Sequence, residues 1–467
     1  MSKGAAAQGY RRTALVVACA LFMQNLDATI LTTALPTMAR EFAVPPANMS
    51  LALTGYLLAL AVFIPASGPV ADRFGGRRTF QAAIALFVLG SVACGFSRGL
   101  ETLVAARFLQ GIGGAMMVPV GRLVLLRSIQ KHEMVAAMAW LTMPAMIGPI
   151  VGPPIGGAIV TWLDWRWIFW VNVPIGLLGV MLVGRHIAEM VPSRRTPFSA
   201  VSFLLCAAAL APLIFGLQLA GRSNHAGIAI GLIVLGAAAA LLYLHHARRV
   251  AYPLLDVTLM RIPTFRLSVL GGGLIRLTQG AMPFLMPMLL QYAFGLNAAA
   301  SGGVTLAMAM GAFVMKGVAR HLLKRFGFRT TLTTIGVLAP LSFAITGFID
   351  RGWPMPVIFA LLLVCGFMIS LQFTAYNAIA YADVDHERMS RATSFYATFQ
   401  QLSLSLGICA GASALGLAMQ WHSHIEPAFG DFTAAIWTVT GISLLATVAN
   451  LSFDRNAGAE LSGHRPG

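Results

Sequence analysis

Charged residues are scarce in this sequence, and acidic residues are the scarcest of them. Only 10% of the 467 residues are Asp, Glu, Lys or Arg, and 16 acidic side chains stand against 32 basic ones. Soluble domains carry about 25% charged residues, so this composition excludes an ordinary soluble domain. With 58% hydrophobic residues and a mean hydropathy of +0.77, the chain is predicted to be a polytopic membrane protein.

Cysteine pairs and nucleotide-binding loops are also missing. The five cysteines lie in apolar runs without CxxC spacing or a nearby histidine partner, so neither a disulfide framework nor a metal site is expected. No Gly-rich loop has P-loop spacing, which argues against a pump driven directly by ATP. The first apolar run is long enough to cross a bilayer, and no cleavable signal peptide is predicted.

The net charge of +16 would suggest nucleic acid in a soluble protein. Here the basic residues lie between apolar runs, where membrane topology explains them, so no nucleic-acid partner is expected. The bilayer is the expected partner instead.

Apolar runs of roughly 20 residues, each able to cross about 30 Å of hydrocarbon as a helix, recur along the chain. Fourteen of them are predicted to be transmembrane helices, so the fold class is all-α. Their limits are 13 to 35, 50 to 70, 79 to 97, 102 to 126, 135 to 160, 167 to 187, 199 to 219, 226 to 246, 267 to 291, 299 to 319, 330 to 349, 354 to 378, 392 to 420 and 432 to 452.

Lysine and arginine predict the orientation. With the N-terminus inside, 23 of the 32 basic residues fall in cytoplasmic segments, five in outer segments and four within spans. This asymmetry places both termini in the cytoplasm and favours an even number of spans.

A short internal repeat predicts the domain organisation. The sequence Arg73-Phe74-Gly75-Gly76-Arg77 after the second span returns as Arg325-Phe326-Gly327-Phe328-Arg329 after the tenth. Related loops at matching places indicate two six-helix bundles, with two extra helices between them. The predicted units are residues 1–190, an insertion with cytoplasmic linkers at 191–255, and residues 256–467 with a short cytoplasmic tail.

Asp27 is the one carboxylate predicted at mid-membrane depth. It lies in Gln24-Asn25-Leu26-Asp27-Ala28-Thr29, inside the first apolar run. A charged side chain at the bilayer centre costs at least about 2.5 kcal/mol, so Asp27 is a functional candidate by default. The alternative is a structural ion pair with a neighbouring arginine.

The loop Gly68-Pro69-Val70-Ala71-Asp72-Arg73-Phe74-Gly75-Gly76-Arg77-Arg78 resembles the signature loop of the major facilitator superfamily. Its glycines allow a tight turn, and Asp72 can pair across a domain interface. The alternative is simple anchoring by the arginines. Gly76 replaces the usual basic residue, and Lys324 stands at the position of Asp72 in the repeat, so the latch is one-sided. The gating-loop candidates are Gly68, Asp72, Arg73, Gly75, Arg77 and Arg78.

The fifth run contains Gly148-Pro149-Ile150-Val151-Gly152-Pro153-Pro154-Ile155-Gly156-Gly157, which resembles the antiporter motif of that superfamily. Glycines four apart lie on one helical face and let another backbone come close, and prolines bend the helix. The candidate residues are Gly148, Gly152, Pro153, Gly156 and Gly157.

The fourth run contains Arg107-Phe108-Leu109-Gln110-Gly111-Ile112-Gly113-Gly114, which resembles the motif whose intramembrane arginine handles protons. Asp27 is the in-span acid available to Arg107, so the two are the predicted proton-coupling pair. A permanent salt bridge is the alternative.

Two further stretches resemble the drug:proton antiporter branch with fourteen spans, which comprises multidrug efflux transporters. They are Leu26-Asp27-Ala28-Thr29-Ile30 with Thr33-Ala34-Leu35-Pro36, and the stretch from Trp165 to Gly176. The resemblance implies export of small amphipathic, drug-like compounds in exchange for protons by alternating access, in the bacterial cytoplasmic (inner) membrane. The proton gradient supplies the energy, and no cofactor is implied. Partners in an envelope-spanning efflux assembly stay unknown.

Polar side chains within the runs are the candidates for a substrate cavity. Those in the second half are as well explained by helix packing as by ligand contact. The candidate cavity residues are Gln24, Asn25, Asp27, Gln110, Arg276, Gln279, Gln291 and Asn377.

Other functions are also considered. The four in-span basic residues, Arg107, Arg122, Arg276 and Lys316, outnumber Asp27 and would favour an organic anion or an anionic metal chelate as substrate. A membrane enzyme would need the loop Asp383-Val384-Asp385-His386-Glu387-Arg388, which is better explained by helix capping and solvation. A sensor of transporter fold is a third alternative. His422 and His424 are expected to be interfacial or solvated, and no metal site is predicted.

Overall fold

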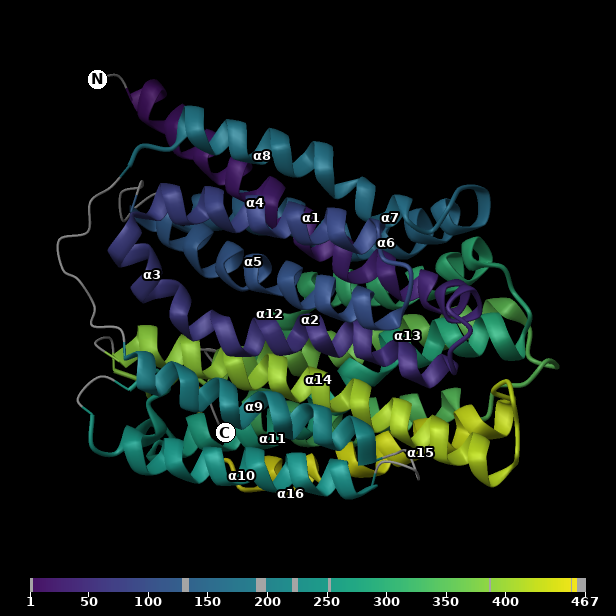
Figure 1. The fold of residues 1–467 in the computed structure, drawn as a ribbon. Coiled ribbons are helices and arrows are strands. Elements are labelled where there is room, and N and C mark those ends of the chain that lie inside the picture. The colour runs from purple at the N-terminus through teal and green to yellow at the C-terminus, as the bar shows by residue number, and fades with distance from the viewer. Residues whose placement is uncertain are drawn as a thin grey trace.

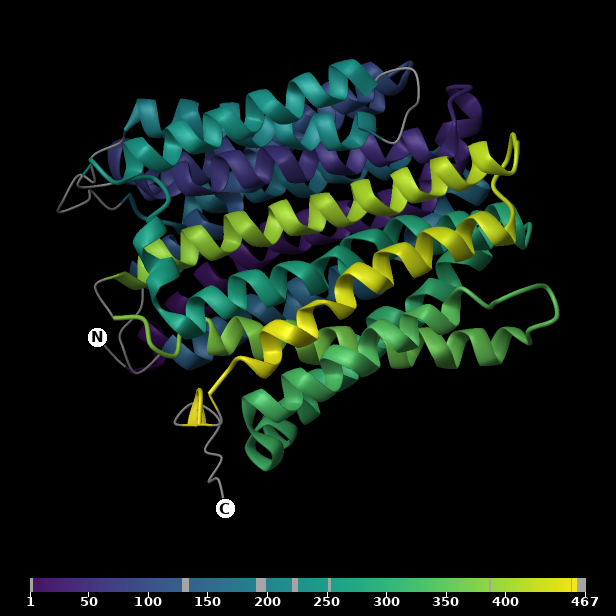
Figure 2. The same ribbon diagram turned by 90° about the horizontal axis from the view of Figure 1, so that it is seen from below.

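Long helices lying side by side make up the computed structural model (Figures 1 and 2). It describes residues 3–127, 134–189, 199–220, 226–250, 253–385, 388–454 and 456–459, with side chains from residue 13 onward and, in the sixth helix, from residue 147. Regular structure in these ranges is helical throughout. Helices satisfy their own backbone hydrogen bonds, which apolar surroundings require.

The helices follow the apolar runs closely. Their bounds are α1 Lys3–Glu41, η1 Pro46–Met49, α2 Ser50–Phe63, η2 Ile64–Ala66, α3 Ser67–Phe74, α4 Gly76–Gly95, α5 Leu100–Arg127, α6 Met134–Trp162, α7 Trp167–Trp170, α8 Asn172–His186, α9 Ala200–Ala220, α10 Ala226–Ala247, η5 Val257–Arg261, α11 Pro263–Met288, η6 Leu289–Ala293, α12 Ala298–Thr346, α13 Met355–Ile379, α14 Met389–Trp421, α15 Phe429–Leu444 and α16 Ala446–Leu451.

Twelve helical segments in the described part of the chain are long and apolar enough to cross a membrane. Each coincides with one of the predicted runs. The other two predicted runs fall on α6, whose described apolar part is Ile147–Trp162, and on α11, where Arg276 and Gln279 lower the hydropathy. Leu177, Leu204 and Leu241 are examples of large apolar side chains left exposed on α8, α9 and α10. The chain is an integral membrane protein.

The two copies of the repeated loop share one backbone feature. Gly75 separates α3 from α4 at a φ of +90°, and Gly327 interrupts α12 at a φ of +73°. Side chains other than glycine seldom adopt this left-handed region. α12 therefore consists of two predicted spans that meet at Gly327.

Glycines of α6 bring three helices into close contact. A Cβ added at Gly148 would lie 3.0 Å from the backbone nitrogen of Leu26, and one at Gly156 would lie 2.8 Å from the carbonyl oxygen of Ile30. On another face of α6, a Cβ at Gly157 would overlap the carbonyl of Ala298 at the start of α12. α6 thus lies between α1 of the first half and α12 of the second.

The end of the molecule where α1 finishes, here called the Glu41 end, joins the two halves by hydrogen bonds. Gln291 donates from Nε2 to the Thr33 carbonyl oxygen at 2.9 Å. The backbone N–H of Ala299 donates to Thr161 Oγ1 at 2.9 Å. Gln291 lies in η6, a π-helical turn that follows Pro287, and π turns commonly re-aim side chains at functional positions.

α9 lies along the boundary between α2 and α14. The amide of Gln218 donates to Ser50 Oγ, and its Oε1 accepts from Thr54 Oγ1 at 2.9 Å, both on α2. The same oxygen accepts from Cys409 Sγ on α14 at 3.2 Å. One buried glutamine therefore bonds to a helix of each half.

Candidate functional site

Asp27 and Arg107 form an ion pair in the interior of the first half. Arg107 Nη1 lies 2.6 Å from Asp27 Oδ2, and both side chains are 1% exposed. α1 supplies the carboxylate at the middle of its length, and α5 supplies the guanidinium. The prediction that Arg107 would use Asp27 as its partner agrees with this arrangement.

Two amide side chains donate hydrogen bonds to the other carboxylate oxygen of Asp27. Asp27 Oδ1 accepts from Gln110 Nε2 at 2.9 Å and from Asn172 Nδ2 at 2.7 Å. Asn172 also donates to Ser91 Oγ at 2.9 Å, and Gln110 Oε1 accepts from Arg107 Nη1 at 2.6 Å. Three donors from three different side chains therefore surround the carboxylate of Asp27.

Arg107 has further neighbours that stabilise its charge. Its guanidinium carbon lies 4.4 Å above the centre of the Tyr56 ring, and Nε donates to the Ala52 carbonyl oxygen at 3.4 Å. Cation–π contacts of this kind contribute about 0.5 to 2 kcal/mol, much less than a buried ion pair loses when one partner is removed. Asp27 is consequently the main compensation for the buried arginine.

Close helix packing holds this network in place. A Cβ at Gly90 would lie 2.5 Å from the Gln110 Cα, and one at Gly111 would lie 2.7 Å from the Tyr56 carbonyl oxygen. α4 and α2 therefore approach the backbone of α5 on two sides. Gly90 and Gly111 are needed for this close approach, which brings Ser91 and Tyr56 to the ion pair.

Gln24 and Asn25 lie near the pair but in different settings. Gln24 is 8% exposed, and its Oε1 has no hydrogen-bond partner in the described part of the chain. Gln24 Nε2 and the Tyr56 hydroxyl both approach Gly114 of α5. Asn25 is half-buried on α1.

Arg276 is the corresponding buried arginine of the second half. It is 3% exposed and donates from Nη2 to the Tyr396 hydroxyl at 2.8 Å. Its guanidinium carbon lies 4.9 Å from the centre of the Tyr396 ring and 5.6 Å from that of Phe373. Among the described residues no carboxylate forms an ion pair with it, and its Nε has no partner. Arg276 and Asp27 thus belong to separate networks.

The remaining predicted cavity residues make packing contacts. Gln279 Nε2 donates to the Ile369 carbonyl oxygen at 3.4 Å, and Asn377 Nδ2 donates to the Phe373 carbonyl oxygen at 2.6 Å. Gln291 reaches across to α1 at the Glu41 end, as described above. The structure does not bring these three side chains together.

The gating-loop residues lie around the α3–α4 corner. A Cβ at Gly75 would overlap the carboxylate of Glu189, which forms an ion pair with Arg78 at 3.7 Å. Arg73 lies over the Phe74 ring at 5.6 Å, and Arg77 lies near Gly184 of α8. A Cβ at Gly68 would meet open space. Asp72 also interacts with a neighbour.

The acidic loop before α14 shows little sign of catalytic assembly in its described part. Asp383 accepts from Thr264 Oγ1 at 2.8 Å, and Arg388 forms an ion pair with Asp256 at 3.2 Å. His386 and Glu387 lie outside the described residues. These contacts fix η5 and α11 to the start of α14.

Comparison with known proteins identifies the family. The model of the Major Facilitator Superfamily matches residues 17–408. The chain belongs to the major facilitator superfamily. This confirms the resemblance expected from the motifs, and it makes the chain a transporter of this superfamily and not an enzyme.

Relatives and solved structures agree with that family. MdtD of Salmonella typhimurium, named as a multidrug resistance protein, is 38% identical over 422 residues, covering 88% of this chain and 87% of MdtD. The human organic anion transporter MFSD10 superposes with a TM-score of 0.63 at 16% identity, covering 94% of this chain and 99% of that one. PepTSo, a POT family transporter, superposes with a TM-score of 0.68 at 13% identity, covering 98% and 99%. At these identities the structures show the fold alone.

Three residues of the network were not predicted. Asn172 lies within the Trp165 to Gly176 stretch, which was interpreted as a mark of the antiporter branch, although an amide inside an apolar run was a usable signal. Ser91 and Tyr56 had no such signal, because small hydroxyls and tyrosines are common in membrane helices.

Proposed function

We propose that this transporter exports small amphipathic, drug-like compounds in exchange for protons by alternating access. The observation that carries this proposal is the fully buried Asp27–Arg107 pair, with its carboxylate held by Gln110 and Asn172. The 38% identity of this chain to MdtD, a protein named for multidrug resistance, supports drug-like compounds as the substrate class.

The ion pair has the properties that proton coupling needs. Protonation of Asp27 removes the charge that compensates Arg107 and leaves a buried cation. Breaking a buried pair in this way costs about 3 to 5 kcal/mol. The protonated protein is therefore driven toward an arrangement in which water reaches Arg107, and loss of the proton restores the pair. If the salt bridge were permanent and purely structural, protonation of Asp27 would not be coupled to a change of conformation.

The topology that we propose has fourteen transmembrane spans, with α6 and α11 added to the twelve segments above. Both termini are cytoplasmic, and the Glu41 end faces outward. α9 and α10 form the insertion between the two six-helix bundles, and the protein lies in the bacterial cytoplasmic membrane. The hydrogen bonds at the Glu41 end then close the outer side in this conformation.

Transport by purified protein in liposomes tests the proposal. An imposed pH gradient should drive accumulation of at least one compound from a panel of amphipathic cations and anions, and an uncoupler should abolish the accumulation. Protein-free liposomes provide the control. Accumulation that is unaffected by the uncoupler would contradict proton coupling.

An organic anion is the second candidate substrate, and Arg276 is the observation that favours it. In the described structure this buried cation donates to the Tyr396 hydroxyl and lies over the rings of Tyr396 and Phe373, whereas Arg107 is paired with a carboxylate. A bound anionic group would supply the missing negative charge.

Replacing Arg276 with Ala should distinguish the two substrate classes. If the anion is the substrate, its export should fall at least tenfold while export of cations stays unchanged. Arg98→Ala is the matched control, because Arg98 is an exposed arginine in the loop between α4 and α5, outside the apolar spans. Unchanged anion export in Arg276→Ala would remove this candidate.

A further inference from the structure

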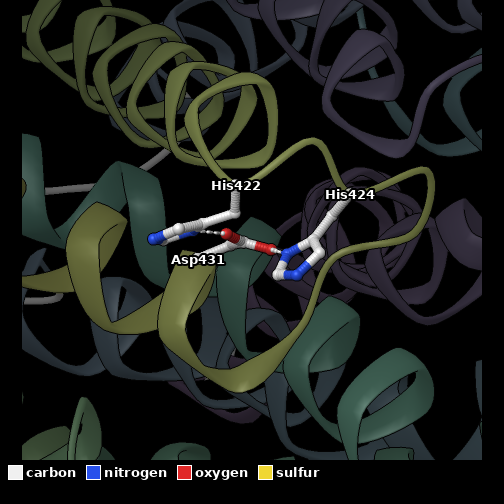
Figure 3. A group of neighbouring side chains, drawn as sticks. All are labelled: His422, His424 and Asp431. Carbon is white, nitrogen blue, oxygen red and sulfur yellow. Dashed lines mark hydrogen bonds and ion pairs between the residues drawn. The ribbon is translucent and has the colours of Figure 1, made fainter.

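His422, His424 and Asp431 lie at the Glu41 end, where α14 turns into α15. Figure 3 shows that their three side chains converge. α14 finishes at Trp421, and the chain reverses through Ser423, which has a φ of +57°. The backbone N–H of His424 then donates to the Met419 carbonyl oxygen at 2.8 Å. The reversal fixes both histidines above the first turn of α15.

The imidazoles of His422 and His424 contact the carboxylate of Asp431 from opposite sides (Figure 3). His422 Nδ1 lies 2.6 Å from Asp431 Oδ1, and His424 Nδ1 lies 2.7 Å from Asp431 Oδ2. The three prospective ligand atoms all lie within 4.8 Å of one another. The side chain of Asp431 is fully buried, whereas those of His422 and His424 are 44% and 41% exposed. The group is thus open to solvent on the imidazole side.

Helix capping accounts for only part of this arrangement. Asp431 Oδ2 accepts the Ala428 backbone N–H at 2.9 Å, which is an ordinary contact at the start of a helix. A cap needs one carboxylate oxygen and no histidine. In the described part of the chain, no lysine or arginine forms an ion pair with this buried carboxylate, and two imidazoles converge on it instead.

We propose that His422, His424 and Asp431 form a binding site for a divalent first-row transition metal ion, of which Zn²⁺ is the best match. Two imidazole nitrogens and one carboxylate oxygen are a common ligand set for Zn²⁺, with water completing a tetrahedron. Ca²⁺ and Mg²⁺ prefer sites made of oxygens alone, so this set disfavours them. Binding would move each histidine proton from Nδ1 to Nε2 and place the ion between the three ligand atoms.

The position of the site suggests what a bound ion would do. The segment between the histidines and Asp431 contributes Pro427, Ala428 and Phe429 to a surface cavity that Tyr292 also lines. Tyr292 contacts α1 of the other half through the Pro36 carbonyl oxygen and the guanidinium of Arg40. An ion that joins the end of α14 to the start of α15 would therefore stiffen the region beside these contacts.

Calorimetric titration of the purified full-length protein with ZnCl₂ tests the site directly. The protein should be stripped of metal with a chelator and carry no histidine tag. We expect one Zn²⁺ per chain, and at least a 100-fold loss of affinity in the His422→Ala/His424→Ala double variant. His245→Ala/His246→Ala is the matched control, because it removes an adjacent histidine pair from the end of α10.

A second readout guards against simple misfolding of the variants. Zn²⁺ should raise the melting temperature of the wild-type and control proteins and leave that of the double variant unchanged, each compared with its own metal-free sample. Co²⁺ should give the visible absorption of a tetrahedral site in the same two proteins only. Equal Zn²⁺ binding by all three proteins, or by none, would overturn the proposal.

Discussion

Proton-driven accumulation should disappear, falling at least 100-fold, when Asp27 is replaced by Asn. The amide keeps the size of the carboxylate and can still bond to neighbouring side chains, but it cannot carry or release the coupled proton. Exchange of labelled for unlabelled substrate requires no net proton movement and should persist. Both activities can be measured with the same proteoliposomes.

The substitution also leaves Arg107 without its counter-charge, so a matched variant is needed. Asp27→Asn should destabilise the protein by about 3 to 5 kcal/mol, because Arg107 stays buried and unpaired. In the double variant Asp27→Asn/Arg107→Gln the unpaired charge is gone, and the melting temperature should recover while coupling stays lost. Gradient-driven accumulation by either variant at the wild-type level would rule out Asp27 as the coupling residue.

Gly302→Ala should open the Glu41 end, whereas Gly303→Ala should not. A Cβ at Gly302 would overlap the Pro153 carbonyl oxygen of α6, and a Cβ at Gly303 would have no atom within 4 Å. Both changes give the helix the same gain in intrinsic propensity. Overpacking of this kind costs about 1 to 3 kcal/mol, and here it can be relieved by separating α6 from α12.

A cysteine pair can report this separation. Thr161 and Ala299 contact each other at the Glu41 end, so a disulfide between Thr161→Cys and Ala299→Cys should form readily in the parent protein. We expect disulfide formation to slow at least tenfold and transport to fall when Gly302→Ala is added. Indistinguishable rates in the Gly302→Ala and Gly303→Ala backgrounds would show that this glycine contact does not control closure of the Glu41 end.

Local sequence information was enough to predict the helices and one ion pair. The hydropathy of a run depends only on its own residues, so the twelve helices that are long and apolar enough to cross a membrane match predicted runs. α11 is not among the twelve, because Arg276 and Gln279 lower its hydropathy. The pairing of Asp27 with Arg107 could be predicted because Asp27 is the single acidic residue within the predicted spans, which leaves Arg107 little choice of partner.

The rest of the network depends on distances along the chain that no local pattern encodes. Asn172 lies 145 residues from Asp27 in the sequence, and it reaches the carboxylate only because α8 packs beside α1. His422 and His424 were expected to be solvated or interfacial on their position alone. Their convergence on Asp431 depends on the left-handed backbone at Ser423. A serine rarely adopts this conformation, so it could not be predicted from the sequence. The domain limits and cavity residues stay predictions.

The hydrogen bonds of Gln218 make the two boundaries between the halves mechanically different. At α6 and α12 the halves meet backbone to backbone. At α2 and α14 the amide of α9 is bonded to both partners at once. If α2 and α14 move apart, α9 can keep its contacts with only one of them, so Gln218 would lose at least one of these hydrogen bonds. A change of conformation at this boundary would therefore involve α9 as a third helix, whereas α6 and α12 are in direct contact with each other.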